Sequence, residues 1–73
     1  MGKLANISGK DAVKAFQKFG WEIRGQVGSH VVMTKTGIRH NLTIPQHSEL
    51  APGTLRGLIR TAGITVEEFL GQI

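Results

Sequence analysis

The stretch "GSHVVM" at residues 28–33 places a histidine, His30, at the start of an apolar run. Imidazole exchanges protons near neutral pH, so histidine is well suited to accept or donate a proton in a reaction. The two other histidines, His40 and His47, lie ten and seventeen residues further along the chain. His30 is therefore either an ordinary strand residue that faces solvent or the chemical centre of the protein.

The sequence argues against several other catalytic chemistries. The chain has no cysteine, which excludes disulfides, thiolate nucleophiles and cysteine-based zinc sites. Its five acidic residues are scattered, and the one adjacent pair, Glu67 and Glu68, belongs to a helix-capping pattern. No metal site and no cofactor are therefore expected. The glycines lack the Gly-x-x-x-x-Gly-Lys spacing of a phosphate-binding loop. Ser29 beside His30 does not by itself indicate a Ser-His-acid triad.

The chemistry that the sequence still allows is metal-free acid–base catalysis on a polyanion. Nine Lys and Arg against five Asp and Glu give a net charge of +4, which favours an anionic partner and above all a nucleic acid. RNA carries its own nucleophile, the 2′-hydroxyl, so an enzyme needs only a proton acceptor, a proton donor and cations near the phosphate. In this hypothesis His30 moves the proton, and Arg24, Arg39 or an arginine of the last long helix supplies positive charge.

The periodicity of apolar residues predicts the elements that position these side chains. Helical spacing follows Ser8, and a period of two begins at Trp21. A Thr65–Glu68 capping box predicts one more short helix at the C-terminus. The predicted elements are a helix at 9–19, strands at 21–27, 30–35 and 38–44, a helix at 53–62 and a final turn of helix from 65. The expected fold class is α+β, with residues 1–73 as a single domain.

Helices on both sides of a three-stranded meander are expected to cover one face of the sheet and to leave the other open. Strand alternation then assigns each residue to a face. The residues predicted beneath the helices are Trp21, Ile23, Val31, Met33, Leu42 and Ile44. Those predicted on the open face are Arg24, Gln26, His30, Thr34, Arg39, Asn41 and Thr43, with Val32 as the apolar exception. The sequence therefore predicts an exposed His30 among polar neighbours.

The order of motifs resembles a known family. "GKDAVKAFQKFGWE", "GSHVVM", "LTIPQH" and "ELAPGTLRGLIRTAGITVEEFL" follow one another as in the HicA toxins, which are mRNA interferases, and the match runs from about Ser8 to Leu70. The resemblance implies a fold similar to a double-stranded-RNA-binding domain and cleavage of mRNA without a metal. It also implies a HicB-type antitoxin as partner and a single catalytic histidine in the Gly-Ser-His motif, which is His30 here.

The sequence departs from the family pattern next to this motif. Relatives often carry basic residues where this chain has Gly25 and Val27, so either Arg24 compensates or the face is less basic than usual. His47 matches the second recurring histidine of the family and is either a structural loop residue or part of the RNA site. The residues predicted to bind RNA are Arg24, Gln26, Ser29, Arg39, His47 and Arg56. Lysines of the first helix are expected to help hold the RNA backbone.

Two other functions remain open at the level of sequence. The first is a non-catalytic RNA-binding domain that uses the same open face of the sheet. The second is an interaction module whose basic face only docks an acidic partner. No apolar run is long enough to suggest a signal peptide or a membrane span, so the expected location is the cytoplasm.

Overall fold

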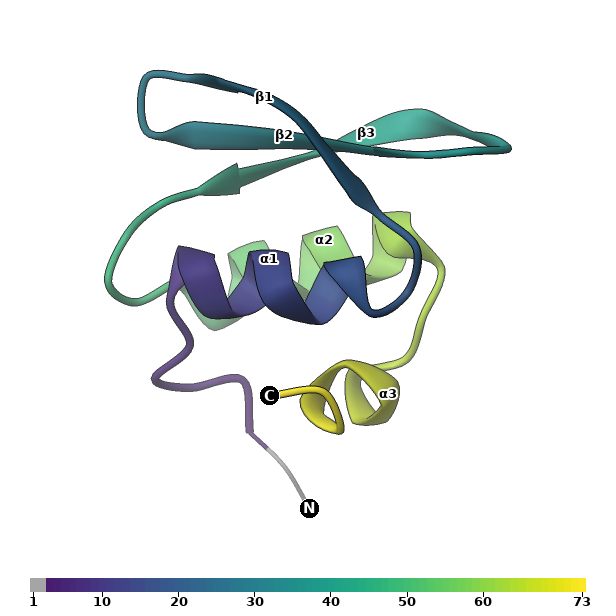
Figure 1. Cartoon of the computed structure of the whole chain (residues 1–73). Coiled ribbons are helices and arrows are strands. Elements are labelled where there is room, and N and C mark those ends of the chain that lie inside the picture. The colour runs from purple at the N-terminus through teal and green to yellow at the C-terminus, as the bar shows by residue number, and fades with distance from the viewer. Residues whose placement is uncertain (1–2) are drawn as a thin grey trace.

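The computed structural model describes residues 3–73, so the first two residues of the predicted domain lie outside it (Figure 1). Its elements are α1 (Gly9–Gln17), β1 (Glu22–Val27), β2 (His30–Lys35), β3 (Ile38–Pro45), α2 (Pro52–Ala62) and α3 (Val66–Leu70). The three strands form one antiparallel sheet in the order β1-β2-β3. This arrangement confirms the predicted α+β fold class.

Helix α1 begins at a reciprocal cap. The Ser8 hydroxyl accepts a hydrogen bond from the backbone N–H of Asp11 at 3.0 Å, and the backbone N–H of Ser8 donates to the Asp11 carboxylate at 3.3 Å. The predicted Thr65–Glu68 box forms the same pair of bonds at the start of α3. Asp11 and Glu68 therefore stabilise the starts of helices, where acidic side chains bind free backbone N–H groups.

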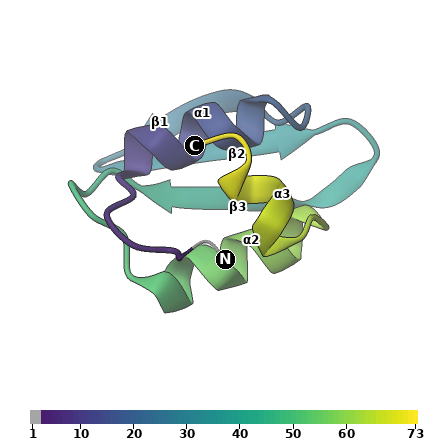
Figure 2. The same ribbon diagram turned by 90° about the horizontal axis from the view of Figure 1, so that it is seen from below.

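The helices lie on one side of the sheet. Figures 1 and 2 show α1 and α2 side by side beneath the strands, with α3 on the far side of the two helices from the sheet. The ring of Phe69 from α3 packs against Phe16 of α1, with 5.1 Å between centroids. Among residues 3–73, no helix lies on the upper face of the sheet, as predicted (Figure 1). No helix of residues 3–73 has the length and apolar character needed to cross a membrane.

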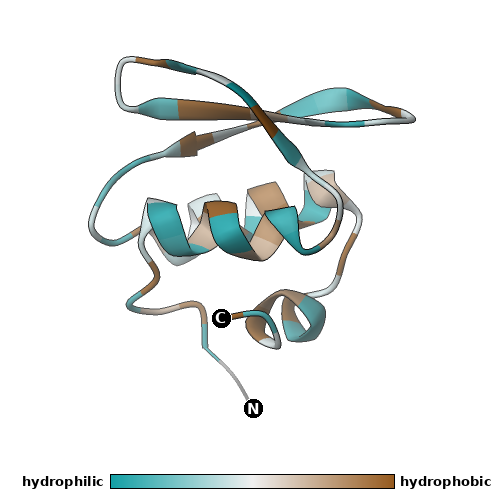
Figure 3. Ribbon diagram, viewed as in Figure 1, coloured by the Kyte–Doolittle hydropathy of each residue, from teal (hydrophilic) through white to brown (hydrophobic). Residues whose placement is uncertain are grey.

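Strand alternation builds most of the core. Of the six residues predicted beneath the helices, five are buried: Trp21, Val31, Met33, Leu42 and Ile44. The hydropathy colouring of the strands in Figure 3 shows the same succession of hydrophobic and hydrophilic segments. Ile23 pairs with buried Met33 and so lies on the predicted face, but it is 51% exposed and not buried. Ile23 lies on the edge strand β1, where no further strand covers its outer side.

A bulge in β1 changes the face assignment of the residues that follow it. Ile23 pairs with Met33 but Gly25 pairs with Val32, so one extra residue of β1 lies between these pairs. An extra residue reverses the alternation beyond it. Gln26 therefore pairs with buried Val31 and lies on the helix-facing side, whereas the sequence predicted it on the open face.

Candidate functional site at the end of the central strand

His30 is the first residue of the central strand β2. Its backbone pairs with Val27 of β1 on one side and with Pro45 of β3 on the other. Because its neighbour Val31 points into the core, the imidazole projects from the open face, and the residue is exposed. A side chain carried by a strand that is paired on both edges is held more precisely than one on a loop.

The cross-strand partners of His30 are apolar. Its two cross-strand partners are Val27, which is 73% exposed, and Pro45, which is half-buried. The next pairs along the sheet on this face are Gly25 with Val32 and Val32 with Thr43. The sequence predicted a polar setting, but the bulge brings Val27 to the open face. His30 thus lies in an apolar collar, which we define as Val27, Val32 and Pro45.

Backbone contacts fix the end of the sheet on which His30 lies. The Gln46 N–H donates to the carbonyl oxygen of Ser29 at 2.6 Å, and the Gly9 N–H donates to that of His47 at 2.9 Å. A Cβ at position 9 would collide with the Pro45 carbonyl oxygen and lie 2.8 Å from Cα of Gln46. Glycine is therefore required where α1 meets the strand end. We call these contacts among residues 9, 29 and 45–47 the clamp.

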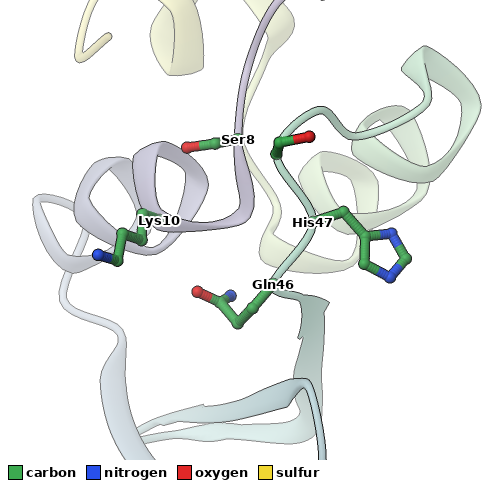
Figure 4. A pocket seen from close by; sticks show the side chains of 5 residues that line it. Ser8, Lys10, Gln46 and His47 are labelled. Carbon is green, nitrogen blue, oxygen red and sulfur yellow. The ribbon is translucent and has the colours of Figure 1, made fainter.

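Ser29 and His47 are brought together by the clamp through their backbones. His47 also lines a shallow hollow of about 310 Å³ with Ser8, Lys10, Gln46 and Ser48. In Figure 4 the Lys10 and Gln46 side chains lie on one side of the 46–48 segment, and the His47 ring points away from them. Both predicted residues are thus next to the strand end that carries His30.

Gln26 does not lie on the open face, and its side chain stabilises the β1–β2 turn. Its side-chain Nε2 donates to the carbonyl oxygen of Gly28 at 3.0 Å, across the β1–β2 turn. Gly28 itself has a φ of 59°, a left-handed conformation that glycine adopts without strain. The amide of Gln26 therefore supports the turn that immediately precedes Ser29 and His30.

Arg24 is on the open face but at a distance from His30. Its Nε donates to the hydroxyl of Thr34 at 3.1 Å. Thr34 lies four residues beyond His30 on β2, which corresponds to about 13 Å of strand. The arginine is thus positioned for a part of a ligand that extends along the sheet from His30, and not for the group at His30 itself.

The two remaining predicted residues lie elsewhere. Arg39 precedes Pro45 by six residues on β3, which corresponds to about 20 Å of strand, so it lies near the opposite end of the sheet from His30. Arg56 of α2 lines a cleft of about 290 Å³ with Ile59, Arg60, Ile64 and Val66, where α2 meets the segment leading into α3. The structure therefore does not bring Arg39 or Arg56 to His30.

Sequence reasoning missed Gly9 and Gln46, which hold the strand end in place. Both lie within recognised motifs, Gly9 in "GKDAV" and Gln46 in "IPQH", but the close approach of Gly9 to the 45–47 segment links residues almost forty positions apart. Nothing in the local pattern of either stretch indicates that pairing. Within residues 3–73, no three His, Asp or Glu side chains are grouped so that they could hold a metal ion.

Two comparisons with known proteins both match toxin–antitoxin proteins. A family model described as the HicA toxin of bacterial toxin–antitoxin systems matches residues 9–64. A solved structure described as a toxin–antitoxin complex from Streptococcus pneumoniae contains a chain with 39% sequence identity and a TM-score of 0.71. That alignment covers 80% of the present chain and 98% of the other. A search of curated proteins gives no match.

Proposed function

The chain belongs to the HicA toxin family of toxin–antitoxin systems, and from this premise we propose that it is an endoribonuclease that cleaves mRNA in the cytoplasm. In this proposal His30 is the single catalytic histidine, and the reaction needs no metal ion. Residues 1–73 act as one domain.

The position of His30 carries the proposal. The residue is exposed at the start of the central strand, and its ring takes no part in the core, yet the clamp and the Gln26 bond hold the backbone on either side of it. A fixed backbone beneath a solvent-accessible imidazole is what general acid–base catalysis requires. The resemblance of the "GSH" motif to the family's catalytic motif supports the same residue.

The proposed reaction uses the nucleophile of the RNA itself. His30 accepts the proton of a 2′-hydroxyl, whose oxygen attacks the adjacent phosphorus, or it donates a proton to the 5′-oxygen as the P–O5′ bond breaks. The proton lost from the 2′-oxygen and the proton gained by the 5′-oxygen balance. The products are an RNA fragment that ends in a 2′,3′-cyclic phosphate and a fragment that begins with a 5′-hydroxyl.

The other predicted residues have supporting roles in this proposal. Arg24, which binds Thr34, contacts the RNA backbone on the open face. The nucleotide it contacts is separated from the scissile phosphate at His30 by the length of strand between His30 and Thr34. Ser29 and His47 flank the scissile phosphate at the clamp. Arg39 and Arg56 would contact only a longer RNA that passes over the ends or the back of the molecule. Phosphate contacts of this kind position a nucleic acid without reading its sequence.

We assign the protein a HicB-type antitoxin as partner. The apolar collar around His30 is a surface that another protein covers more favourably than a polyanion does, because apolar burial stabilises protein interfaces. A partner that packs on Val27 and Val32 would also hide His30 from RNA.

Purified protein incubated with labelled mRNA, with and without EDTA, tests the proposal. We expect cleavage at equal rates in both samples, and fragments that begin with a 5′-hydroxyl and are labelled by polynucleotide kinase without prior phosphatase treatment. Cleavage that stops with EDTA and returns with magnesium would contradict the metal-free mechanism. RNA binding without cleavage would instead indicate a non-catalytic RNA-binding domain.

A further inference from the structure

A basic groove runs along α1 on the helix side of the sheet. The hollow beside His47 and a second hollow of about 340 Å³ share Lys10 and Gln46 in their walls, so they adjoin each other. The other residues of the second hollow are Val13, Lys14, Gln17, Ile23 and Val31. We call the two adjoining hollows the α1 groove; their lining residues run from the 46–48 segment along α1 to Ile23 of the edge strand β1. Figure 4 shows the part that is lined by Ser8, Lys10, Gln46 and His47.

The α1 groove begins at the clamp. Gln46, which lines both hollows, donates its backbone N–H to the carbonyl oxygen of Ser29, and Ser29 directly precedes His30. A chain bound over His30 on the open face would reach the groove by passing over this end of the sheet. His47 lies at this crossing point.

The lining of the α1 groove suits a single strand of RNA. Its charged residues are Lys10 and Lys14, both exposed on α1, and it has hydrogen-bonding groups on Ser8, Gln17 and Gln46. None of its lining residues is acidic. The nearby Asp11 carboxylate is bound to the Ser8 backbone N–H in the helix cap. The lysines can therefore bind phosphates as point charges.

Ile23 contributes exposed apolar surface to the α1 groove. This residue faces the helix side of the sheet on the edge strand, is 51% exposed, and lines the groove together with Val13 and Val31. Apolar surface of this kind can pack against the face of a base, while the lysines on the opposite wall neutralise the phosphates. A base-paired duplex offers no free base faces for such a contact.

We propose that the α1 groove is the second part of the RNA site and binds single-stranded RNA on one side of the scissile phosphate, with Lys10 and Lys14 on its phosphates. The inference rests on the proposed function, and it specifies that the substrate is single-stranded and crosses the end of the sheet. RNA bound only on the open face would not reach these lysines.

The test compares two double variants in the full chain. Lys10→Ala/Lys14→Ala removes both lysines of the α1 groove, and Lys3→Ala/Lys35→Ala removes one exposed and one half-buried lysine outside it. Both variants have the same net charge. Binding of a fluorescent single-stranded RNA is measured across a salt series in a His30→Ala background, which prevents cleavage. A paired RNA of the same length is measured in parallel.

The groove variant should lower the log–log salt slope of single-strand binding by about 1.4, at about 0.7 per lost phosphate contact, while the control leaves the slope unchanged. With His30 present, the same variant should raise the KM for a long RNA and leave cleavage of a dinucleotide unaltered. Equal slopes for the two double variants would overturn the inference, as would an effect on the paired RNA alone or on antitoxin binding alone.

The experiment distinguishes failure of the groove proposal from failure of the ribonuclease proposal. If the unmodified chain binds RNA and the groove variant lowers the slope, but no RNA is cleaved, the α1 groove is an RNA site and the ribonuclease assignment is wrong. If the chain cleaves RNA and the two double variants behave alike, the ribonuclease assignment stands and the groove does not bind RNA.

Discussion

Along β2 the covered and the open face of the sheet alternate residue by residue. Val31 and Met33 are 7% and 0% exposed beneath the helices, whereas His30 is exposed and Val32 is half-buried on the other face. The covered side chains contribute the apolar burial that stabilises the fold. The open ones contribute little to stability and are available for binding. Stability and activity are therefore expected to respond to different substitutions in neighbouring positions.

The largest difference between lost activity and lost stability is expected for His30→Ala. Loss of a general acid or base typically slows a reaction by about 10²–10⁴-fold, so RNA cleavage should fall by that factor. Since the ring lies outside the core, the free energy of unfolding should change by no more than about 0.5 kcal/mol. Cleavage assays and thermal unfolding measure the two effects, with exposed His40→Ala as control. A folded variant that still cleaves at the original rate would shift the catalytic role to His47.

Met33→Ala examines the covered face. Met33 is fully buried, and truncation of such a residue to alanine typically destabilises a protein by about 2–5 kcal/mol through lost burial and a residual cavity. Denaturant unfolding should show this loss, while the folded fraction should retain its cleavage rate per molecule. A rate that falls further than the folded fraction would show that the two faces are coupled.

Gly9→Ala acts at the clamp, where the helix layer meets the strand end. The added methyl group collides with the Pro45 carbonyl, and overpacking of this kind costs about 1–3 kcal/mol. Gly57→Ala in α2 is the matched control, since a Cβ there meets nothing within 4 Å and alanine favours a helix by about 0.5–1 kcal/mol. Thermal unfolding should give opposite signs for the two variants. If both variants were destabilised, the collision at the clamp could not be the reason for the loss of stability in Gly9→Ala.

The smallest effect is expected for Val27→Thr on the open face. Val27 is 73% exposed, so a hydroxyl there stays hydrated and unfolding should change by no more than about 0.5 kcal/mol. Val31→Thr is the counterpart on the covered face and buries a hydroxyl, which costs about 1–3 kcal/mol without a partner. Denaturant unfolding of the two variants should therefore differ, although the substitution is identical. Equal losses would show that the bulge assigns Val27 to the wrong face.

Local patterns in the sequence were sufficient to predict the elements and their order. Period-two alternation in 30–35 holds because β2 is central and regular at its start, so His30 and Met33 fall on the predicted faces. The same rule failed for Gln26, because a bulge adds one residue and leaves no mark in the apolar pattern except a nearby glycine, Gly25.

The site was less predictable than the fold, because its parts meet through contacts distant in sequence. The Gln46–Ser29 bond and the Gly9–His47 bond join segments that no periodic pattern relates. Arg39 was assigned to the correct kind of element, but its distance from His30 depends on strand direction and register. Residue types therefore predicted the chemistry, whereas tertiary contacts decide which of those residues share one ligand.

The burial of Trp21 gives this protein a built-in optical probe. It is the only tryptophan, the chain has no tyrosine, and its side chain is 1% exposed in the core beneath the sheet. Its fluorescence should shift to longer wavelength when the core opens, and should change little when RNA or a partner covers the open face. One emission spectrum, recorded during the binding or cleavage assay, therefore distinguishes a variant that has lost its fold from one that has lost only its ligand.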